Sequence, residues 1–436
     1  MSSAVRFLLI LFGLLCLPSD GWAQPDEPSP PGLLDRTFSL LRDEGLSGSF
    51  RLDYFRSSKN LENKTDFAGG TVQIKLTPRF VDWLDGKVEA RTTEPDLFGD
   101  RLESDTTLLE GYLTIHFARA DIRIGKQIVA WGRADGINPT DNLTPHDFVV
   151  LLPFEEDQRF GTTGMRIDGY LTTELTLTLF TTPFFEPSKI PLGDATEGTV
   201  IEDRPDHAFS NSEFGLKLNR SGGTLDGSVS YFHGYDLLPD ARIVGLLPSG
   251  PVLELRHNRI NVVGADAARN FGRYGFRAEA AYFMTRDRDG QDPTVKNPFL
   301  FYVAGIDRTF LENLNLNLQF VGRWVKDFND PEDIADPALK TVAIQNAIFD
   351  NQQDRASYGL TSRIGEKWLN DTLEAEILFF MNFRRTDWFA RPLVTYAFTD
   401  HARGTIGGEI YQGPEDSFFG RLIDNRGAFI ELRYSF

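Results

Sequence analysis

The chain has 436 residues and a formal net charge of −18, with 45 Lys and Arg against 63 Asp and Glu. This acidic balance argues against nucleic acid as a partner, because the phosphate backbone selects basic surfaces. The one cysteine, Cys16, lies in an N-terminal apolar stretch. The remainder of the chain therefore has no thiol for a disulfide, a cysteine-ligated iron–sulfur cluster or a nucleophile.

The N-terminus has the pattern of a secretory signal. Arg6 supplies a short basic region, Phe7 to Leu17 is an apolar run, and Gly21-Trp22-Ala23 offers small residues for cleavage. The apolar run is too short to span a bilayer as a helix. We predict that 1–23 is a signal peptide and that the mature chain starts at Gln24.

Residues 24–45 are predicted to be a periplasmic lead. Gln24 to Gly32 is rich in proline, and Leu33 to Glu44 has apolar residues at roughly helical spacing. We expect a short amphipathic helix there. The barrel described next is predicted over 46–436.

From Leu46 onward, apolar and polar residues alternate in segment after segment, which predicts about eighteen strands. Most are longer than the strands of soluble sheets and match the length that a tilted strand needs to cross a bilayer. The predicted strands are 46–56, 69–79, 84–94, 105–118, 120–130, 162–171, 173–182, 209–219, 223–235, 253–265, 271–285, 297–309, 312–326, 354–364, 371–383, 387–398, 402–412 and 426–436.

The connections between these strands alternate between short and long. The short ones are 80–83, Arg119, Thr172, 220–222, 266–270, 310–311, 365–370 and 399–401. The long ones are 57–68, 95–104, 131–161, 183–208, 236–252, 286–296, 327–353 and 413–425, and 384–386 is an exception. Short turns on one side and long loops on the other predict an all-β transmembrane antiparallel barrel with periplasmic turns and extracellular loops.

The last predicted strand, 426–436, has Ile430, Leu432 and Tyr434 on one face and Glu431 and Arg433 on the other. It ends at an aromatic residue with no polar tail. It resembles the closing strand of Gram-negative outer-membrane barrels, the segment that their assembly machinery recognises. The resemblance implies pairing with the first strand, which removes both sheet edges.

Tryptophans are expected to form girdles at the two membrane interfaces. Trp83 and Trp368 fall near predicted periplasmic turns, and Trp131, Trp324 and Trp388 near the predicted outer ends.

The polar faces of the strands predict a lumen wall in which the two charge signs are mixed. Such charges need water or each other, so we expect a wet lumen or one crossed by ion pairs. The predicted wall residues are Arg51, Asp53, Lys75, Glu89, Arg91, Glu110, Arg123, Arg166, Asp168, Glu213, Lys217, Arg277, Glu279, Arg323, Glu374, Glu376, Glu431 and Arg433.

The third outer loop, 131–160, is long and contains an apolar run, Phe148 to Phe154, that water would cover poorly. Our hypothesis is that it folds into the barrel and narrows it; the alternative is a loop packed on its neighbours outside the pore. The predicted constriction residues are Arg133, Asp135, Asn138, Asp141, His146, Asp147, Glu155, Glu156 and Arg159.

The segment 123–132, RIGKQIVAWG, and the later 138–141, NPTD, resemble the G-x-Q-x-V-x-W-G … N-P-x-D pattern of a porin-like group of Gram-negative outer-membrane barrels whose function is largely unassigned. The alginate-export type of barrel is a looser match. The resemblance implies a passive channel or an export conduit. An exporter of an acidic polymer would have an arginine-rich lumen, whereas the predicted wall is balanced.

Motifs for covalent or metal chemistry are weak. The histidines show no metal-pair spacing, and no G-x-S-x-G elbow occurs. Ser230 and His233 share a predicted strand, where local hydrogen bonding is the simpler interpretation. The acidic turn 287–292 only loosely resembles a calcium loop. We expect no enzyme activity, no cofactor and no metal.

The sequence therefore predicts a channel in the outer membrane of a Gram-negative bacterium that passes small solutes and is constricted by the third loop. A conduit or scaffold barrel working with an export, transport or electron-transfer partner is the alternative, and a barrel lipid hydrolase is a third. Expected partners are outer-membrane lipid and lipopolysaccharide, the assembly machinery through the C-terminal strand, and a periplasmic protein; nucleic acid is not expected.

Overall fold

The computed structural model describes residues 45–61, 64–97, 104–149, 155–190, 200–247 and 250–436. The predicted signal peptide and nearly all of the predicted lead lie outside these residues, so both stay predictions.

Within the described residues, a nineteen-stranded sheet comprises eighteen wall strands and the short β3, Arg79–Val81. Each wall strand pairs antiparallel with its chain neighbours, and β22 pairs with β1, so the wall is a closed barrel. The wall strands are β1 (Leu46–Leu61), β2 (Lys64–Leu76), β4 (Leu84–Glu94), β5 (Asp105–Phe117), β6 (Ala120–Gln127), β7 (Thr162–Tyr170), β8 (Leu175–Thr182), β10 (Glu213–Arg220), β11 (Asp226–Tyr235), β14 (Arg259–Phe271), β15 (Tyr274–Met284), β16 (Phe299–Phe310), β17 (Leu314–Val325), β18 (Ala356–Trp368), β19 (Leu373–Asn382), β20 (Asp387–Ala397), β21 (Ala402–Gln412) and β22 (Gly427–Ser435).

The seam of the barrel confirms the prediction for the last strand. β22 pairs with β1 from Ser49 opposite Ser435 to Ser57 opposite Gly427. Beyond the strand, Gly48 and Phe436 exchange backbone hydrogen bonds of 3.1 and 3.0 Å. These bonds satisfy the backbone groups at the seam, as a strand in a bilayer requires.

Exposure alternates along the wall strands as the sequence predicts. On β22, Ile430 is 47% exposed whereas Glu431 is 1% exposed. The same contrast separates Ile74 from Thr71 on β2 and Val263 from Asp266 on β14. Apolar side chains therefore cover the outer surface, and many polar ones face the lumen.

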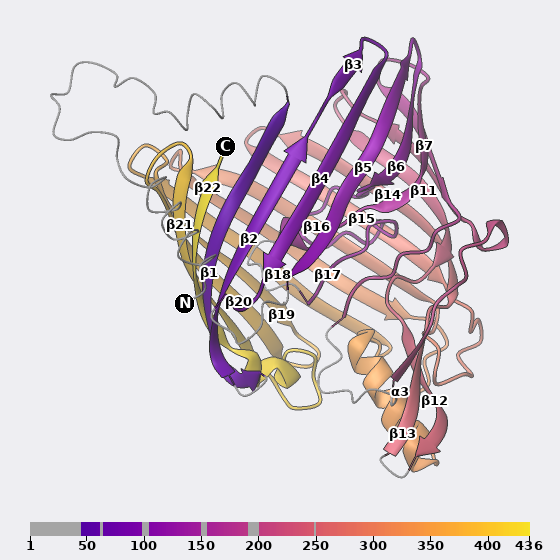
Figure 1. The fold of residues 1–436 in the computed structure, drawn as a ribbon. Helices are drawn as coiled ribbons and strands as arrows, with labels where there is room; N and C mark the ends of the chain where they lie inside the picture. The colour runs from indigo at the N-terminus through magenta and orange to yellow at the C-terminus, as the bar shows by residue number, and fades with distance from the viewer. Residues whose placement is uncertain (1–44, 62–63, 98–103, 150–154, 191–199, 248–249) are drawn as a thin grey trace, which may run out of the picture.

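The two ends of the barrel differ, as Figure 1 shows: β3 marks the end with tight turns, and α3, β12 and β13 extend from the other end. The long connections at that end hold a three-stranded sheet of β9 (Val200–Asp203), β12 (Asp240–Leu247) and β13 (Gly250–Arg256), in which β9 and β13 are parallel. They also hold α3 (Pro337–Phe349) and the 3-10 helices η1 (Glu155–Gln158), η2 (Phe209–Asn211), η3 (Pro331–Asp333) and η4 (Gly420–Asn425).

Helix α3 begins where the sequence supplies a cap, because the Asp336 side chain accepts a hydrogen bond from the Leu339 N–H and Pro337 occupies the first turn. No helix among the described residues is both long and apolar enough to cross a membrane.

Some strand boundaries were wrong. The predicted loop 57–68 is mostly strand, because β1 continues to Leu61 and β2 begins at Lys64. The predicted strand 253–265 is instead the end of β13 followed by β14, which starts at Arg259. The predicted turn 266–270 consequently lies within β14, and the chain reverses at Gly272, whose φ of 61° suits glycine. The number of wall strands is as predicted.

Candidate functional site: the loop inside the barrel

The connection between β6 and β7, residues 128–161 and called loop 3 below, contacts inward-facing side chains of the wall. Its described parts are 128–149 and 155–161. They make hydrogen bonds or ion pairs with β1, β4, β5, β10, β14, β15, β17 and β18. β1 and β15 lie far apart around the barrel, so loop 3 is bonded to widely separated parts of the wall.

One side of the lumen holds loop 3 through an apolar cluster. Its members are Val129, Trp131 and Leu143 of the loop and Phe180, Phe232, Ile260, Val262, Ala281, Phe283, Phe299 and Val325 of the wall. Phe283 and Phe299 stack with ring centroids 4.3 Å apart. Trp131 is 5% exposed. The prediction that Trp131 belongs to an outer aromatic girdle was therefore wrong, since its indole packs inside the barrel.

Glu279 of β15 binds the first half of loop 3. Its Oε1 accepts hydrogen bonds from Thr140 N (2.7 Å) and Thr140 Oγ1 (2.9 Å). Its Oε2 accepts from Arg133 N (3.0 Å), Ala134 N (3.3 Å) and Asn138 Nδ2 (3.4 Å). A carboxylate that is 3% exposed is thus surrounded by donors from one loop.

Gly132 explains part of the W-G motif. Its φ is +102°, and a Cβ there would lie 2.6 Å from Glu279 Oε2. A larger residue would therefore push the loop away from Glu279. The W-G and N-P-T segments of the pattern meet at this one wall carboxylate.

Two further wall contacts extend the attachment. Arg133 donates from Nε to Asp266 of β14 at 2.5 Å and from an amino group to Asn219 of β10 at 2.5 Å. Asp135 exchanges backbone hydrogen bonds with the Gln319 side chain at 3.0 and 2.7 Å and lies 3.2 Å from Arg363.

The opposite side of the lumen holds the end of loop 3 through charges. Arg51 of β1 forms a two-pronged ion pair with Asp157 at 2.5 and 2.8 Å. Arg91 of β4 donates to the Asp157 carbonyl. Close by, Glu110 of β5 accepts from the Ile128 N–H at 3.0 Å and pairs with Lys87.

The middle of loop 3 brings together three predicted constriction residues. Arg159 lies 3.4 Å from His146 Nε2 and 3.9 Å from Asp141. Burial raises the pKa of Asp141 to about 7. Burial, with the Arg159 charge, lowers the pKa of His146 to about 4. The imidazole is therefore neutral near neutral pH.

The remaining constriction residues lie apart from this group. Asp147 pairs with Lys189 of the following outer loop at 3.0 Å. Arg133, Asp135 and Asn138 bond the wall as described above. Glu155 and Glu156 open η1, and their side chains lie outside the described part of the structure. Phe148 and Val149 are 45% and 51% exposed, and the rest of the predicted apolar run is not described.

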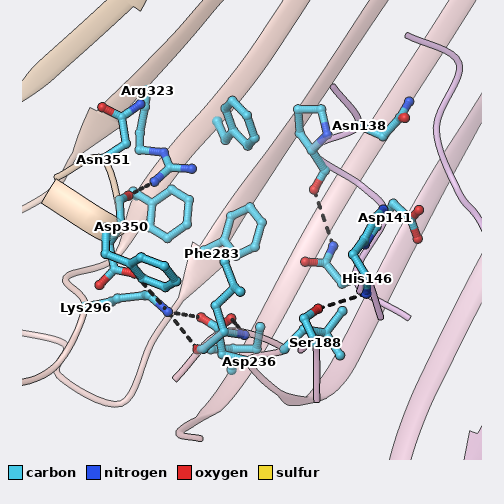
Figure 2. Close-up of a pocket in the computed structure, with 18 of the residues that line it drawn as sticks. Asn138, Asp141, His146, Ser188, Asp236, Phe283, Lys296, Arg323, Asp350 and Asn351 are labelled. Carbon is cyan, nitrogen blue, oxygen red and sulfur yellow. Dashed lines mark hydrogen bonds and ion pairs between the residues drawn. The ribbon is translucent and has the colours of Figure 1, made fainter. Parts of the chain in front are cut away.

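A cavity of about 250 Å³ lies between loop 3 and the wall. Figure 2 shows Asn138, Asp141 and His146 of loop 3 on one side and Phe283 and Arg323 of the wall on the other. The cavity is the space that the packed loop leaves beside the apolar cluster.

Lys296 joins the outer loops at this cavity. Its ammonium lies 2.9 Å from Asp236 and 3.2 Å from Asp350, and it donates to the Leu238 carbonyl at 2.9 Å (Figure 2). Although burial lowers the pKa of Lys296, these carboxylates raise it above its ordinary value. The lysine therefore stays charged and ties three connections together.

The predicted wall residues lie on inward faces of the strands, and the structure adds their register. Arg51, Arg433 and Arg403 stand directly opposite one another on β1, β22 and β21. Arg123 and Arg166 are paired in the same way on β6 and β7. Like charges at opposed positions repel, so these rows favour anions or water beside them.

Other predicted wall charges pair locally. Arg166 lies 2.8 Å from Asp168, Lys217 3.7 Å from Asp266, Arg277 3.4 Å from Asp307, Arg363 3.3 Å from Glu376 and Lys367 3.9 Å from Glu374. Asp53 and Glu431 face each other on β1 and β22, and the Glu213 carboxylate of β10 accepts from the Tyr235 N–H at 2.9 Å. Arg323 stacks on Phe299 and Phe301 with its guanidinium 4.5 and 4.8 Å from the ring centres. Lys75 lies on the inward face of β2 opposite Glu89 of β4, which is 2.7 Å from Lys87.

The sequence did not lead us to predict the apolar cluster, because the predicted wall residues were all charged. A signal was present, because 299–303 of β16 reads FLFYV, apolar on both faces. A continuous apolar run indicates a strand covered on both sides. Here lipid faces one side and loop 3 packs on the other side of the wall.

Residues for other chemistry do not assemble in the described structure. No group of three or more potential metal ligands occurs among the described residues. Ser230 and His233 are an odd number of positions apart on β11, so their side chains point to opposite faces. His233 instead bonds Asn261 through Nδ1 at 2.8 Å.

Comparison with known proteins identifies the fold. OccAB4 of Acinetobacter baumannii is 10% identical with a TM-score of 0.53, over 90% of this chain and 97% of that one. OccK8 (OprE) of Pseudomonas aeruginosa is 9% identical with a TM-score of 0.53, over 90% and 97%. The chain has the fold of a porin-like outer-membrane β-barrel.

A third similar structure is that of Pseudomonas aeruginosa OpdK with vanillate, 8% identical with a TM-score of 0.52, over 90% of this chain and 98% of that one. No family model matches the sequence. No curated protein matches it either. At 8–10% identity these likenesses show the fold alone.

Proposed function

We propose that the protein is a passive channel for small solutes in the outer membrane of a Gram-negative bacterium. The observation that carries the proposal is a closed barrel whose inward face is largely charged and polar. Charged groups in such a wall are stable where water fills the lumen between them. An apolar outer face on the same strands suits a lipid environment.

Loop 3 is proposed to be the element that narrows the channel. Its contacts to Arg51 on one side and Glu279 on the other support a position across the lumen. The partly exposed charged side chains of the predicted constriction are those of Arg133, Asp135 and Arg159, whereas those of Asp141 and Asp147 are buried. Width and charge at this level would then filter solutes without covalent chemistry.

The same features bear on where the protein is located and on its family. The fold supports an outer-membrane position, with lipopolysaccharide around the outer face and recognition of the closing strand by the assembly machinery. The W-G … N-P-T-D segments support membership of the porin-like group of largely unassigned function. A periplasmic partner remains part of the alternative described below.

The test is the conductance of the refolded protein in a planar bilayer with a salt gradient. Steady steps are expected, and the sign of the reversal potential reports which wall charges dominate. A folded, heat-modifiable barrel that gives no steps contradicts the channel.

One observation favours the alternative of a conduit or scaffold barrel. The apolar cluster buries side chains of loop 3 against the wall, which suits a plugged lumen. A plugged barrel would copurify with a partner and would conduct only when that partner is bound. The lipid-hydrolase alternative has less support, because Ser230 and His233 point to opposite faces of β11.

A further inference from the structure

The contacts of Glu279 are unlike those of other wall carboxylates. Most inward carboxylates pair with a cation on the same or the next strand, as Glu376 does with Arg363 at 3.3 Å. Glu279 receives five hydrogen bonds from loop 3, three of them from backbone N–H groups. A buried carboxylate needs such donors, because leaving it without them costs its full desolvation.

The loop depends on the carboxylate in the same way. Between Arg133 and Thr140 the chain turns back on itself, and its N–H groups at 133, 134 and 140 point to one place on the wall. Backbone donors inside a protein must find an acceptor. Glu279 supplies it for all three.

The backbone of loop 3 follows a path that allows close contact with Glu279. The positive φ of Gly132 lets the chain pass so close to Glu279 that a Cβ there would clash with both carboxylate oxygens. The Gly264 position on β14 is similarly close to Thr140, where an added Cβ would lie 2.5 Å from Thr140 Cγ2. The loop and two neighbouring wall strands are therefore fitted to one docked position.

We infer that Glu279 is the positioning residue that holds loop 3 across the lumen. Its carboxylate fixes the turn 133–140, and that turn carries Asn138 and leads into Asp141 and His146. The open width of the channel is then set by a wall residue that lies in none of the sequence motifs. This inference rests on the proposed channel function for its effect on conductance, but the docking of the loop is measurable on its own.

The test compares Glu279→Gln with Glu374→Gln. Glu374 also faces inward, on β19, and is half-buried, with Lys367 Nζ at 3.9 Å. Both substitutions remove one negative charge from the wall. Only Glu279→Gln places an amide NH₂ group opposite the hydrogen-bond donors of loop 3. A carboxylate accepts hydrogen bonds with both of its oxygens, whereas an amide accepts with one oxygen and donates with its nitrogen.

Loop docking is read from thiol labelling of Thr144→Cys in a Cys16→Ser background. Thr144 is 1% exposed, so a water-soluble maleimide is expected to react slowly in the parent. Glu279→Gln is expected to speed labelling roughly a hundredfold, because charge-assisted hydrogen bonds are lost from the docked state. Glu374→Gln is expected to leave the labelling rate at that of the parent.

Conductance is measured on the same proteins. Glu279→Gln is expected to increase the conductance of the open channel and to make it fluctuate more. Glu374→Gln is expected to change ion selectivity alone. Equal labelling of the two variants, or no increase in Glu279→Gln, overturns the inference. Faster labelling in a barrel that never conducts leaves Glu279 as the positioning residue and contradicts the channel function instead.

A milder pair of variants covers a failure of Glu279→Gln to fold. Thr140→Val removes the hydroxyl donor at 2.9 Å and keeps the backbone donor. It is expected to raise labelling several-fold, since one hydrogen bond is lost. Glu279→Asp keeps the charge and is expected to label more slowly than Glu279→Gln. Labelling at the parent's rate in Thr140→Val would count against the inference.

Discussion

Different kinds of interaction hold loop 3 on its two sides. On the side of β14 to β16, Trp131 and Leu143 pack into an apolar cluster and Glu279 receives a ring of donors. On the side of β1 and β4, Asp157 is held by Arg51 and Arg91. The Arg51 and Asp157 side chains are only 1% and 11% exposed, so salt screens this ion pair much less than it screens a surface pair.

The difference assigns a role to each side. The apolar side fixes where the loop lies, because close-packed side chains have one good arrangement. The charged side fixes the loop end through the geometry of the two-pronged Arg51–Asp157 pair, because two parallel hydrogen bonds define the orientation of the carboxylate. The two sides together hold both halves of loop 3 to the wall.

The largest effect is expected from Trp131→Ala. Removing a buried tryptophan from the cluster should destabilise the docked loop by about 3–5 kcal/mol. Thiol labelling at Thr144→Cys should then become fast, and channel recordings should become noisy. Trp324→Ala is the control, because Trp324 is 42% exposed on the outer face. If both variants behave like the parent, the apolar side does not hold the loop.

The next effect is expected from Arg51→Gln. It removes a two-pronged ion pair with Asp157 that is buried on the arginine side, and such truncations cost roughly 2–5 kcal/mol. Asp157→Asn and the double variant complete a cycle that isolates the pair energy. Because both side chains are nearly closed to water, the coupling energy should change little between low and high salt. A coupling energy near zero would show that this ion pair does not hold the loop end.

A pH effect of intermediate size is expected within loop 3. The pKa of Asp141 rises from 3.8 to about 7, so the docked loop binds a proton more tightly and docking strengthens as pH falls from 7 towards 4. The pKa of His146 falls from 6.5 to about 4, so the docked loop excludes a proton and docking weakens over the range from 6.5 to 4.

The two shifts oppose each other, so single variants should separate them. Asp141→Asn leaves the histidine effect and should loosen the loop in acid, by about tenfold in labelling or more. His146→Gln leaves the aspartate effect and should tighten it. Open probability recorded at pH 7 and pH 5 measures both. Two variants with the same pH response would show that neither group is coupled to docking.

The smallest effect is expected from Arg433→Gln, which removes one charge from the row of Arg51, Arg433 and Arg403 near Asp157. The reversal potential should move towards cation preference by a few millivolts to about ten, as expected for one charge in a screened wall. Loop labelling should rise far less than in Arg51→Gln, because Arg51 and not Arg433 makes the two-pronged ion pair with Asp157.

The barrel could be predicted from the sequence because its evidence is local. Strand length, alternation and the short–long order of connections all lie within segments of the chain, and they gave the correct number of wall strands. The predicted strand 253–265 failed because β13 and β14 are separated only by His257 and Asn258. Alternation alone does not reveal that the first of these two strands leaves the wall.

The site could be predicted only in part. The long loop and its charged residues were visible, and so was the motif around Trp131. The wall partners of the loop could not be predicted, because Glu279 and Arg51 lie more than a hundred positions away from the loop residues that they bind, Thr140 and Asp157. Helix α3 offered a local signal in Asp336 and Pro337 that the strand pattern obscured.

The closed seam has a consequence for assembly. Loop 3 is bonded to β1, near the start of the wall, and to β15, well past its middle, while β1 waits for β22 at the very end of the chain. Inserting loop 3 into a barrel that has already closed would require all of these contacts to form at once. We expect the sheet to curl around the loop as it forms, with the final strand sealing it in. Loop 3 would then act as a template around which the barrel strands pair.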